Sequence, residues 1–165
     1  MTSESKETSK KYQLALDCAE QGQYAEALDS IQSYLDETPD DAEALNDAGT
    51  ILWCQGLSND ALTYLQKARQ VAVDSPEILR NLFETYLSLG LGKDAASLFD
   101  ELERTKILHV DMLNRTATIL IDAGDLSEAL SALKRSLALE PGQKILEPIV
   151  DVVRYKMEAQ QQSVV

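Results

Sequence analysis

A period of 34 residues runs through most of this chain and constrains its fold more than any other feature. Four glycines keep this interval: Gly22, Gly56, Gly90 and Gly124. Five residues after each glycine stands an alanine, which an acidic residue precedes: Ala27, Ala61, Ala95 and Ala129. A bulky apolar residue follows each alanine by four positions: Ile31, Leu65, Phe99 and Leu133. Several independent positions therefore share one register, which indicates four copies of one supersecondary unit.

Each unit is predicted to be a helical hairpin. The glycine ends an apolar-periodic segment, where a left-handed residue terminates a helix. The acidic residue then falls in the first turn of the next helix, whose N-terminus favours negative charge. The alanine follows where the two helices cross, and its small side chain permits close packing. The first helices are expected at 8–21, 42–55, 76–89 and 110–123, and the second helices at 24–37, 58–71, 92–105 and 126–139.

The helix starts and links carry further signals. Ser58 and, less favourably placed, Ser127 are candidate N-cap residues for second helices. Ser75 followed by Pro76 is an N-cap before a proline at the first helical position. The link from Lys106 to Val110 contains neither proline nor glycine, unlike the other links between units.

Composition agrees with long helices and short turns. The 165 residues include only four prolines and seven glycines, and aromatic residues make up 5%. A core of this composition must rely on alanine and branched aliphatic side chains. The formal net charge of −13 makes nucleic acid and anionic membrane surfaces poor partners.

The period and its residues resemble the tetratricopeptide repeat family. The resemblance covers residues 8–143 as four repeats: 8–41, 42–75, 76–109 and 110–143. It implies an all-α fold, an α-α superhelix (solenoid) of four hairpins. The family places a small residue in the first helix, against the second. Ala15, Gly49 and Ala117 match this pattern, whereas Phe83 departs from it.

Two terminal segments lie outside the repeats. Residues 144–160 carry a helical apolar set, which we interpret as a capping helix covering the last repeat. That set is Ile145, Ile149, Val152, Val153 and Met157. A docking or dimerisation helix is the alternative. Residues 1–7 are expected to form a flexible tail and residues 161–165 a frayed end.

No constellation of catalytic residues is found, so the chain is not expected to be an enzyme or to need a cofactor or metal. His109 is the only histidine, and it falls in a link between repeats. Cys18 and Cys54 form no Cys-x-x-Cys pair and are expected to be free, buried thiols in a reducing cytoplasm. No stretch is long and apolar enough to span a membrane.

Stacked hairpins place their first helices on a concave wall. By resemblance to the family, the wall positions suggest a peptide-binding groove formed by Tyr12, Asn46, Thr50, Trp53, Arg80, Glu84, Asn114 and Thr118. The Asn/Thr pairs could bind the backbone of an extended peptide, or they could be ordinary exposed residues. Trp53 is a candidate anchor, and the alternative is a core residue packed between the second and third repeats.

These features predict a non-enzymatic, cytoplasmic adaptor that binds a protein or peptide segment. Some family members bind acidic chaperone C-termini through a carboxylate clamp. Tyr12 and Leu16 stand where that clamp needs lysine and asparagine, so a neutral, mixed or basic segment is favoured. The alternatives are a substrate-holding module of an enzyme such as a protein glycosyltransferase, a small acidic secretion or assembly chaperone, and a self-associating scaffold.

Overall fold

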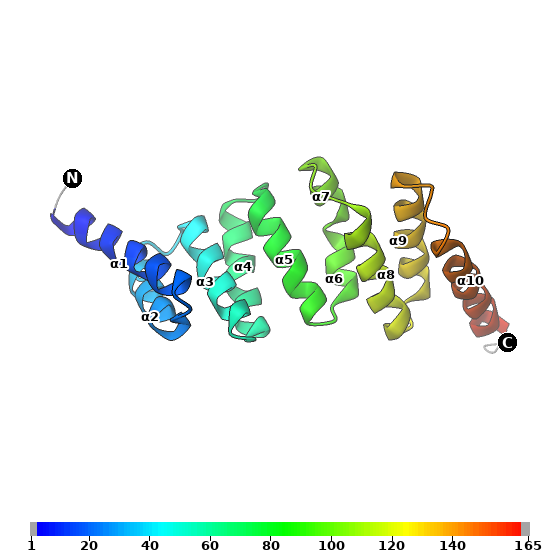
Figure 1. Cartoon of the computed structure of the whole chain (residues 1–165), viewed down its shortest axis with the longest axis horizontal. Coiled ribbons are helices and arrows are strands. Elements are labelled where there is room, and N and C mark those ends of the chain that lie inside the picture. The colour runs from blue at the N-terminus through cyan, green and yellow to red at the C-terminus, as the bar shows by residue number, and fades with distance from the viewer. Residues whose placement is uncertain (1–2, 163–165) are drawn as a thin grey trace. The chain divides into compact units, whose positions relative to one another are not determined.

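The computed structural model describes residues 3–162, and this range contains helices and no strand. The all-helical prediction is confirmed, and Figure 1 shows the helices in chain order. The chain divides into two compact units, unit 1 ending at Thr85 and unit 2 beginning at Tyr86. The helices are α1 (Ser3–Glu20), α2 (Tyr24–Leu35), α3 (Ala42–Cys54), α4 (Ser58–Val71), α5 (Pro76–Ser88), α6 (Gly92–Ser97), α7 (Phe99–Arg104), α8 (Val110–Ala123), α9 (Leu126–Leu139) and α10 (Leu146–Gln162).

Unit 1 contains α1 to α4 and the first ten residues of α5. Helix α1 packs on α2, α2 on α3 and α3 on α4, as consecutive hairpins require. The repeat alanines Ala27 and Ala61 are completely buried, and so is Ala15 of α1. Small side chains at these crossings let the backbones approach, while Ile31 and Leu65 fill the space one turn further along.

The four repeat glycines all adopt positive φ angles, from +70° to +82°. A Cβ added at any of them would meet nothing within 4 Å, so lack of space does not explain the glycines. The left-handed backbone conformation explains them, because a residue with a side chain is strained at a positive φ angle. The predicted helix-terminating role is therefore confirmed.

The N-caps were only partly predicted. The hydroxyl of Ser75 accepts a hydrogen bond from the Ile78 N–H at 3.4 Å, which confirms it as a cap. The prediction for Ser58 is wrong, because α4 begins at Ser58 itself and Leu57 holds the N-cap position. Ser127 likewise lies inside α9, whose N-cap is Asp125. Asp41 caps α3, because its side chain accepts hydrogen bonds from two backbone N–H groups. An N-cap residue must stand one position before the first helical residue, and Ser58 and Ser127 do not.

Unit 2 contains the end of α5 and the helices α6 to α10. Helix α6 packs on α8, α8 on α9 and α9 on α10. The single helix predicted at 92–105 is instead two short helices, α6 and α7, which meet at Leu98. Leu98 is completely buried. The link after α7 turns through Lys106, whose φ of +62° makes it the one non-glycine residue with positive φ among those described.

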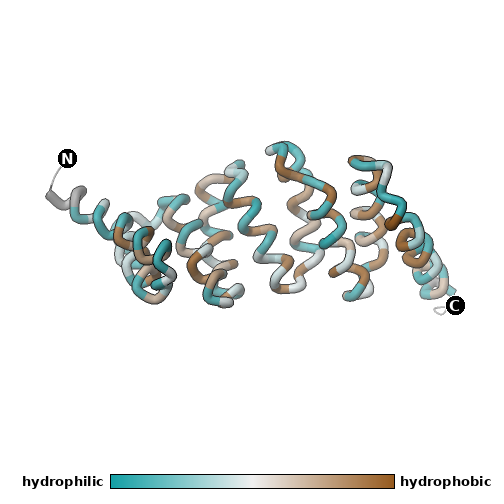
Figure 2. The backbone as a smooth tube through the Cα atoms, in the orientation of Figure 1, coloured by the Kyte–Doolittle hydropathy of each residue, from teal (hydrophilic) through white to brown (hydrophobic). Residues whose placement is uncertain are grey.

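The C-terminal helix α10 packs on α9, but through a different face than the predicted apolar set suggested. The buried residues are Leu146, Val150 and Val153. Ile149 and Val152 are exposed, and Figure 2 shows hydrophobic and hydrophilic residues alternating along this helix. Of the set expected to face the last repeat, only Val153 is buried and Met157 half-buried. Apolar residues lie around a wide arc of α10, and only part of that arc packs on α9. The prediction did not distinguish the packed part from the exposed part.

The ends of the described chain differ from the expected boundaries. Helix α1 begins at Ser3, within the segment predicted as a tail, and α10 continues to Gln162. Residues 1–2 and 163–165, the remainder of the predicted tails, lie outside the described residues. Helix α10 begins two residues before Pro148, so this proline falls in the first turn, where it is tolerated.

Candidate functional site

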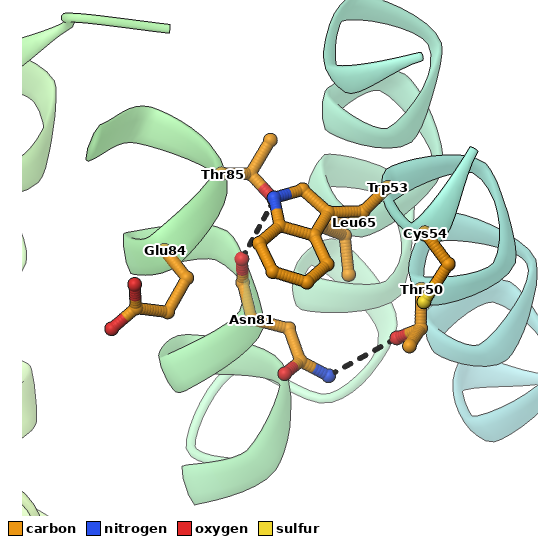
Figure 3. Close-up of a pocket in the computed structure, with 7 residues that line it drawn as sticks. All are labelled: Thr50, Trp53, Cys54, Leu65, Asn81, Glu84 and Thr85. Atoms are coloured by element: carbon orange, nitrogen blue, oxygen red, sulfur yellow. Dashed lines mark hydrogen bonds between the residues drawn. The ribbon is translucent and has the colours of Figure 1, made fainter. Parts of the chain in front are cut away.

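A cleft in unit 1, named here the Trp53 cleft, lies among α3, α4 and α5 (Figure 3). It contains about 410 Å³ of empty space, part of it open to solvent. Figure 3 shows Asn81 and Glu84 of α5 across the Trp53 indole from Thr50 and Cys54 of α3. The lining residues are Thr50, Trp53, Cys54, Leu65, Asn81, Glu84 and Thr85.

Trp53 is the only tryptophan of the chain, and the residue is 43% exposed. It is therefore not a core residue, and the alternative of a tryptophan buried between the second and third repeats is wrong. Leu65, 1% exposed, lies beneath it as part of the interior. Cys54 is also exposed, so the expectation of two buried thiols holds only for Cys18.

Hydrogen bonds fix the polar side of the cleft. The Asn81 amide donates from Nδ2 to Asn46 Oδ1 at 2.9 Å and to Thr50 Oγ1 at 3.4 Å, which joins α5 to α3. The Thr85 hydroxyl donates to the Asn81 carbonyl oxygen at 2.8 Å. Sequence reasoning missed Asn81, because its partners lie 31 and 35 positions earlier in the chain.

The predicted Asn46 contact with a peptide needs correction. Asn46 is only 3% exposed, and its side chain accepts the bond from Asn81. Thr50 donates its hydroxyl to the Asn46 carbonyl oxygen at 3.0 Å, one helical turn back. Asn46 therefore holds two first helices together, and Thr50, which is half-buried, remains on the cleft wall.

The second Asn/Thr pair belongs to unit 2 and also forms internal bonds. Asn114 donates from Nδ2 to Gln143 Oε1 at 2.9 Å, and Thr118 donates to the Asn114 carbonyl oxygen at 3.1 Å. Gln143 in turn donates to the buried Ser136 hydroxyl at 3.0 Å. Thr118 is exposed. Both pairs therefore share a threonine bond to the backbone one helical turn back.

Tyr12 lies on the first-helix face of unit 1, where it bonds to a carboxylate that sequence reasoning had not singled out. Its hydroxyl donates to Asp47 Oδ2 at 2.6 Å. Its ring stacks on Tyr34, with 4.9 Å between the ring centroids. The Tyr34 hydroxyl donates to the N-cap residue Asp41 at 2.7 Å. Arg80 of α5 is exposed, and Glu84 is half-buried at the cleft.

Asp47 lies in a region of negative electrostatic potential, close to other carboxylates. Burial raises the pKa of the Asp47 carboxyl, and the neighbouring carboxylates Glu43 and Glu77 raise it further. The hydrogen bond from Tyr12 acts in the opposite direction. Burial and donation to Asp47 also raise the pKa of the Tyr12 hydroxyl, which keeps it protonated as a donor.

We expect Asp47→Asn to change how stability depends on pH. Because the pKa of Asp47 is higher in the folded than in the unfolded chain, its contribution to stability is complete below about pH 4 and is lost as pH rises through the folded pKa. The asparagine amide oxygen still accepts from Tyr12 but does not ionise. The variant should therefore gain stability relative to the native chain between about pH 4 and pH 7.

Urea unfolding followed by circular dichroism at several pH values measures this difference. Asp29→Asn, at an exposed position in the middle of α2, is the matched control because it removes the same charge from the surface and lies outside the first turn of its helix. A difference between Asp47→Asn and the native chain that stays constant or shrinks as pH rises would contradict the assignment.

The described part of the chain contains no group of three or more His, Cys, Asp or Glu side chains arranged to hold a metal ion. Within the same part, no helix has the length and apolar character needed to cross a membrane. The surface of unit 1 carries a partly exposed tryptophan, a cleft and a charged helix face.

The fold and this surface define an array of helical hairpins, and the comparisons give its family. The tetratricopeptide repeat model matches residues 12–76 and 80–144, so the chain belongs to the tetratricopeptide repeat family. No curated protein matches the sequence.

Several solved structures share the fold. A crystal structure of MamA protein is similar with a TM-score of 0.72 and 16% identity, covering 95% of this chain and 86% of that one. MamA 41-end from Desulfovibrio magneticus RS-1 has a TM-score of 0.68 and 13% identity, covering 95% and 89%. YrrB, described as a TPR protein with an unusual peptide-binding site, has a TM-score of 0.68 and 19% identity, covering 82% and 70%. At these identities the likeness concerns the fold alone.

Proposed function

We propose that this protein is a non-enzymatic scaffold that holds a segment of a partner protein on the first-helix face of unit 1. The Trp53 cleft takes an apolar side chain of that segment. Thr50 and Glu84 line the cleft beside it. Arg80 lies on α5, and Tyr12 lies on α1, where its hydroxyl donates to Asp47 of α3. Asn46 and Asn81 hold α3 and α5 together and keep the cleft open.

The partly exposed tryptophan carries this proposal. Trp53 is 43% exposed beside a cleft. Leaving a tryptophan partly in water has a free-energy cost that binding an apolar group can recover, and tryptophan is enriched among the residues that dominate binding energy. The hydrogen bonds across the cleft reduce the rearrangement that binding requires. The peptide-binding site described for YrrB supports the idea that this fold can hold a peptide segment.

The chemistry of the partner follows from charge. With a net charge of −13, the chain repels acidic segments and nucleic acid at long range, so a neutral, mixed or basic protein segment fits better. The cleft is most suited to one aliphatic or aromatic side chain, because its interior is formed by Trp53 and Leu65.

We expect Trp53→Ala to weaken binding of a captured segment by about tenfold or more, which is typical of a central aromatic anchor. Peptides selected from a random displayed library on the immobilised chain would serve as probes. Because Trp53 is the only tryptophan, its fluorescence reports on this cleft in the native chain. The Trp53→Ala variant contains no tryptophan, so the affinities of the two chains are compared by isothermal titration calorimetry. Binding should shift the emission to shorter wavelength as the indole loses water.

Leu14→Ala is the control, because Leu14 is an exposed apolar residue of unit 1, 54% exposed, that does not line the cleft. It should leave affinity within about twofold, as expected for a residue outside a binding hot spot. The proposal fails if selected peptides bind the Trp53→Ala variant as tightly as the native chain, or if they bind without changing the tryptophan emission.

A further inference from the structure

The Trp53 cleft continues along two helix faces toward a group of carboxylates. On α3, Glu43, Asp47, Thr50 and Cys54 recur at positions i, i+4, i+7 and i+11 and therefore share one face. On α5, Glu77, Asn81 and Glu84 recur in the same way. The residues in the C-terminal halves of both faces line the cleft. Those in the N-terminal halves are Glu43, Asp47 and Glu77, named here the acidic step.

The acidic step and the cleft are adjacent because α3 and α5 are joined between them. Asn81, one turn after Glu77, donates to Asn46 and Thr50, which flank Asp47 along α3. Asp47 also interacts electrostatically with both Glu43 and Glu77. The three carboxylates therefore lie close to one another and about one helical turn from the cleft.

The negative charge of the acidic step is not neutralised within the described residues. None of the ion pairs found there involves Glu43, Asp47 or Glu77. Burial and repulsion from the other two carboxylates raise the pKa of Asp47, as expected where no cation is bound nearby. The described residues also form no metal-binding group. A basic side chain is therefore the ligand that would relieve this repulsion.

We propose that the segment held by the cleft is extended and carries a lysine or arginine two residues away from its apolar anchor, so that the basic side chain reaches the acidic step. This inference rests on the proposed function of the Trp53 cleft. Its occupant is a basic-apolar protein segment, chosen because its charge complements that of the acidic step.

The spacing follows from backbone geometry. One turn of α3 or α5 advances about 5.4 Å along the helix axis. In an extended peptide, side chains on the same side are two residues and about 6.6 Å apart. A basic residue next to the anchor would instead point to the opposite side, away from both faces. The acidic step therefore selects for position as well as for charge.

A peptide series with one leucine anchor in a Ser/Gly background tests this inference. Lysine, glutamine or glutamate is placed two residues from the anchor on either side, and a parity control places lysine directly next to the anchor. Affinity is read from Trp53 emission. Lysine at the second position should bind about fivefold or more tightly than glutamine there, and glutamate should bind most weakly.

The preference should disappear in the double variant Glu43→Gln/Glu77→Gln, which alters two exposed side chains. Asp29→Asn/Asp60→Asn is its control, because it removes two exposed charges from the second helices α2 and α4 and should keep the preference. Circular dichroism checks that both variants keep the native helix content. Loss of the preference in high salt would agree with an electrostatic origin.

The outcomes separate the two proposals. Peptides that shift Trp53 emission equally well with lysine, glutamine or glutamate would overturn the basic-residue inference and leave the cleft as a binding site. Equal affinity for the parity control would overturn the extended geometry. If no peptide of the series shifts the emission while library-selected peptides do, the inference fails alone. If neither the designed peptides nor the library-selected peptides shift the Trp53 emission, both proposals fail.

Discussion

Gly49→Ala is expected to destabilise unit 1 by about 1–2 kcal/mol, although alanine normally favours a helix over glycine by about 0.5–1 kcal/mol. A Cβ at Gly49 would lie 2.7 Å from Leu65 Cγ and 3.2 Å from the Ala61 carbonyl oxygen. Leu65 is 1% exposed, and the Ala61 oxygen belongs to the backbone of α4. Neither atom can move without disturbing the packing of α3 on α4, and overpacking of this kind costs about 1–3 kcal/mol.

Thermal unfolding followed by circular dichroism measures this loss, at about 2–4 °C per kcal/mol for a chain of this size. Gly142→Ala is the matched control. A Cβ at Gly142 would meet nothing within 4 Å, and Gly142 has no positive φ. An unchanged or raised melting temperature for Gly49→Ala would show that α3 and α4 do not approach as closely as the structure indicates.

The repeat sequence predicts the fold well because each repeated position serves one local requirement. The glycines end helices by their φ angles, and the alanines are completely buried where helices cross. Both requirements act over a few residues or within one hairpin. For that reason the predicted bounds of α4, α8 and α9 coincide with those of the structure.

The predictions failed at positions that the repeat period does not mark. The break at Leu98 between α6 and α7 has no proline or glycine to announce it. Lys106 turns the link after α7 with a φ of +62°, a position where sequence patterns would expect glycine. Neither feature is marked by the 34-residue period.

The candidate site shows the same limit. Three of the predicted wall positions, Thr50, Trp53 and Glu84, line the Trp53 cleft, because the repeat register identifies first-helix positions. The exposure of Trp53 and the burial of Asn46 could not be predicted from the sequence, because both depend on how α3 packs against α5. Asp47 was missed because its importance arises from Tyr12, 35 residues away, and from its carboxylate neighbours. Burial and cross-repeat bonds decide which residues of that face are available to a ligand.

Val153→Asp is expected to detach α10 from α9. Val153 is 1% exposed, and an unpaired carboxylate at that position would cost at least about 3 kcal/mol if α10 stayed in place. Releasing α10 avoids this cost at the expense of its contacts with α9. Because a terminal helix covers the apolar end of a repeat array, the released form should also expose the apolar surface of α9 and tend to aggregate.

Limited digestion with trypsin, read by mass spectrometry, distinguishes docked from released α10. Arg154 and Lys156 lie within α10 and should be cleaved readily only when the helix unfolds. Val152→Asp is the control, because the neighbouring Val152 is 53% exposed and the charge change is identical. We expect it to leave α10 protected. Equal cleavage of the two variants, or full protection of α10 in Val153→Asp, would mean that the buried face of α10 does not hold it on α9. The interpretation of this segment as a cap would then be wrong.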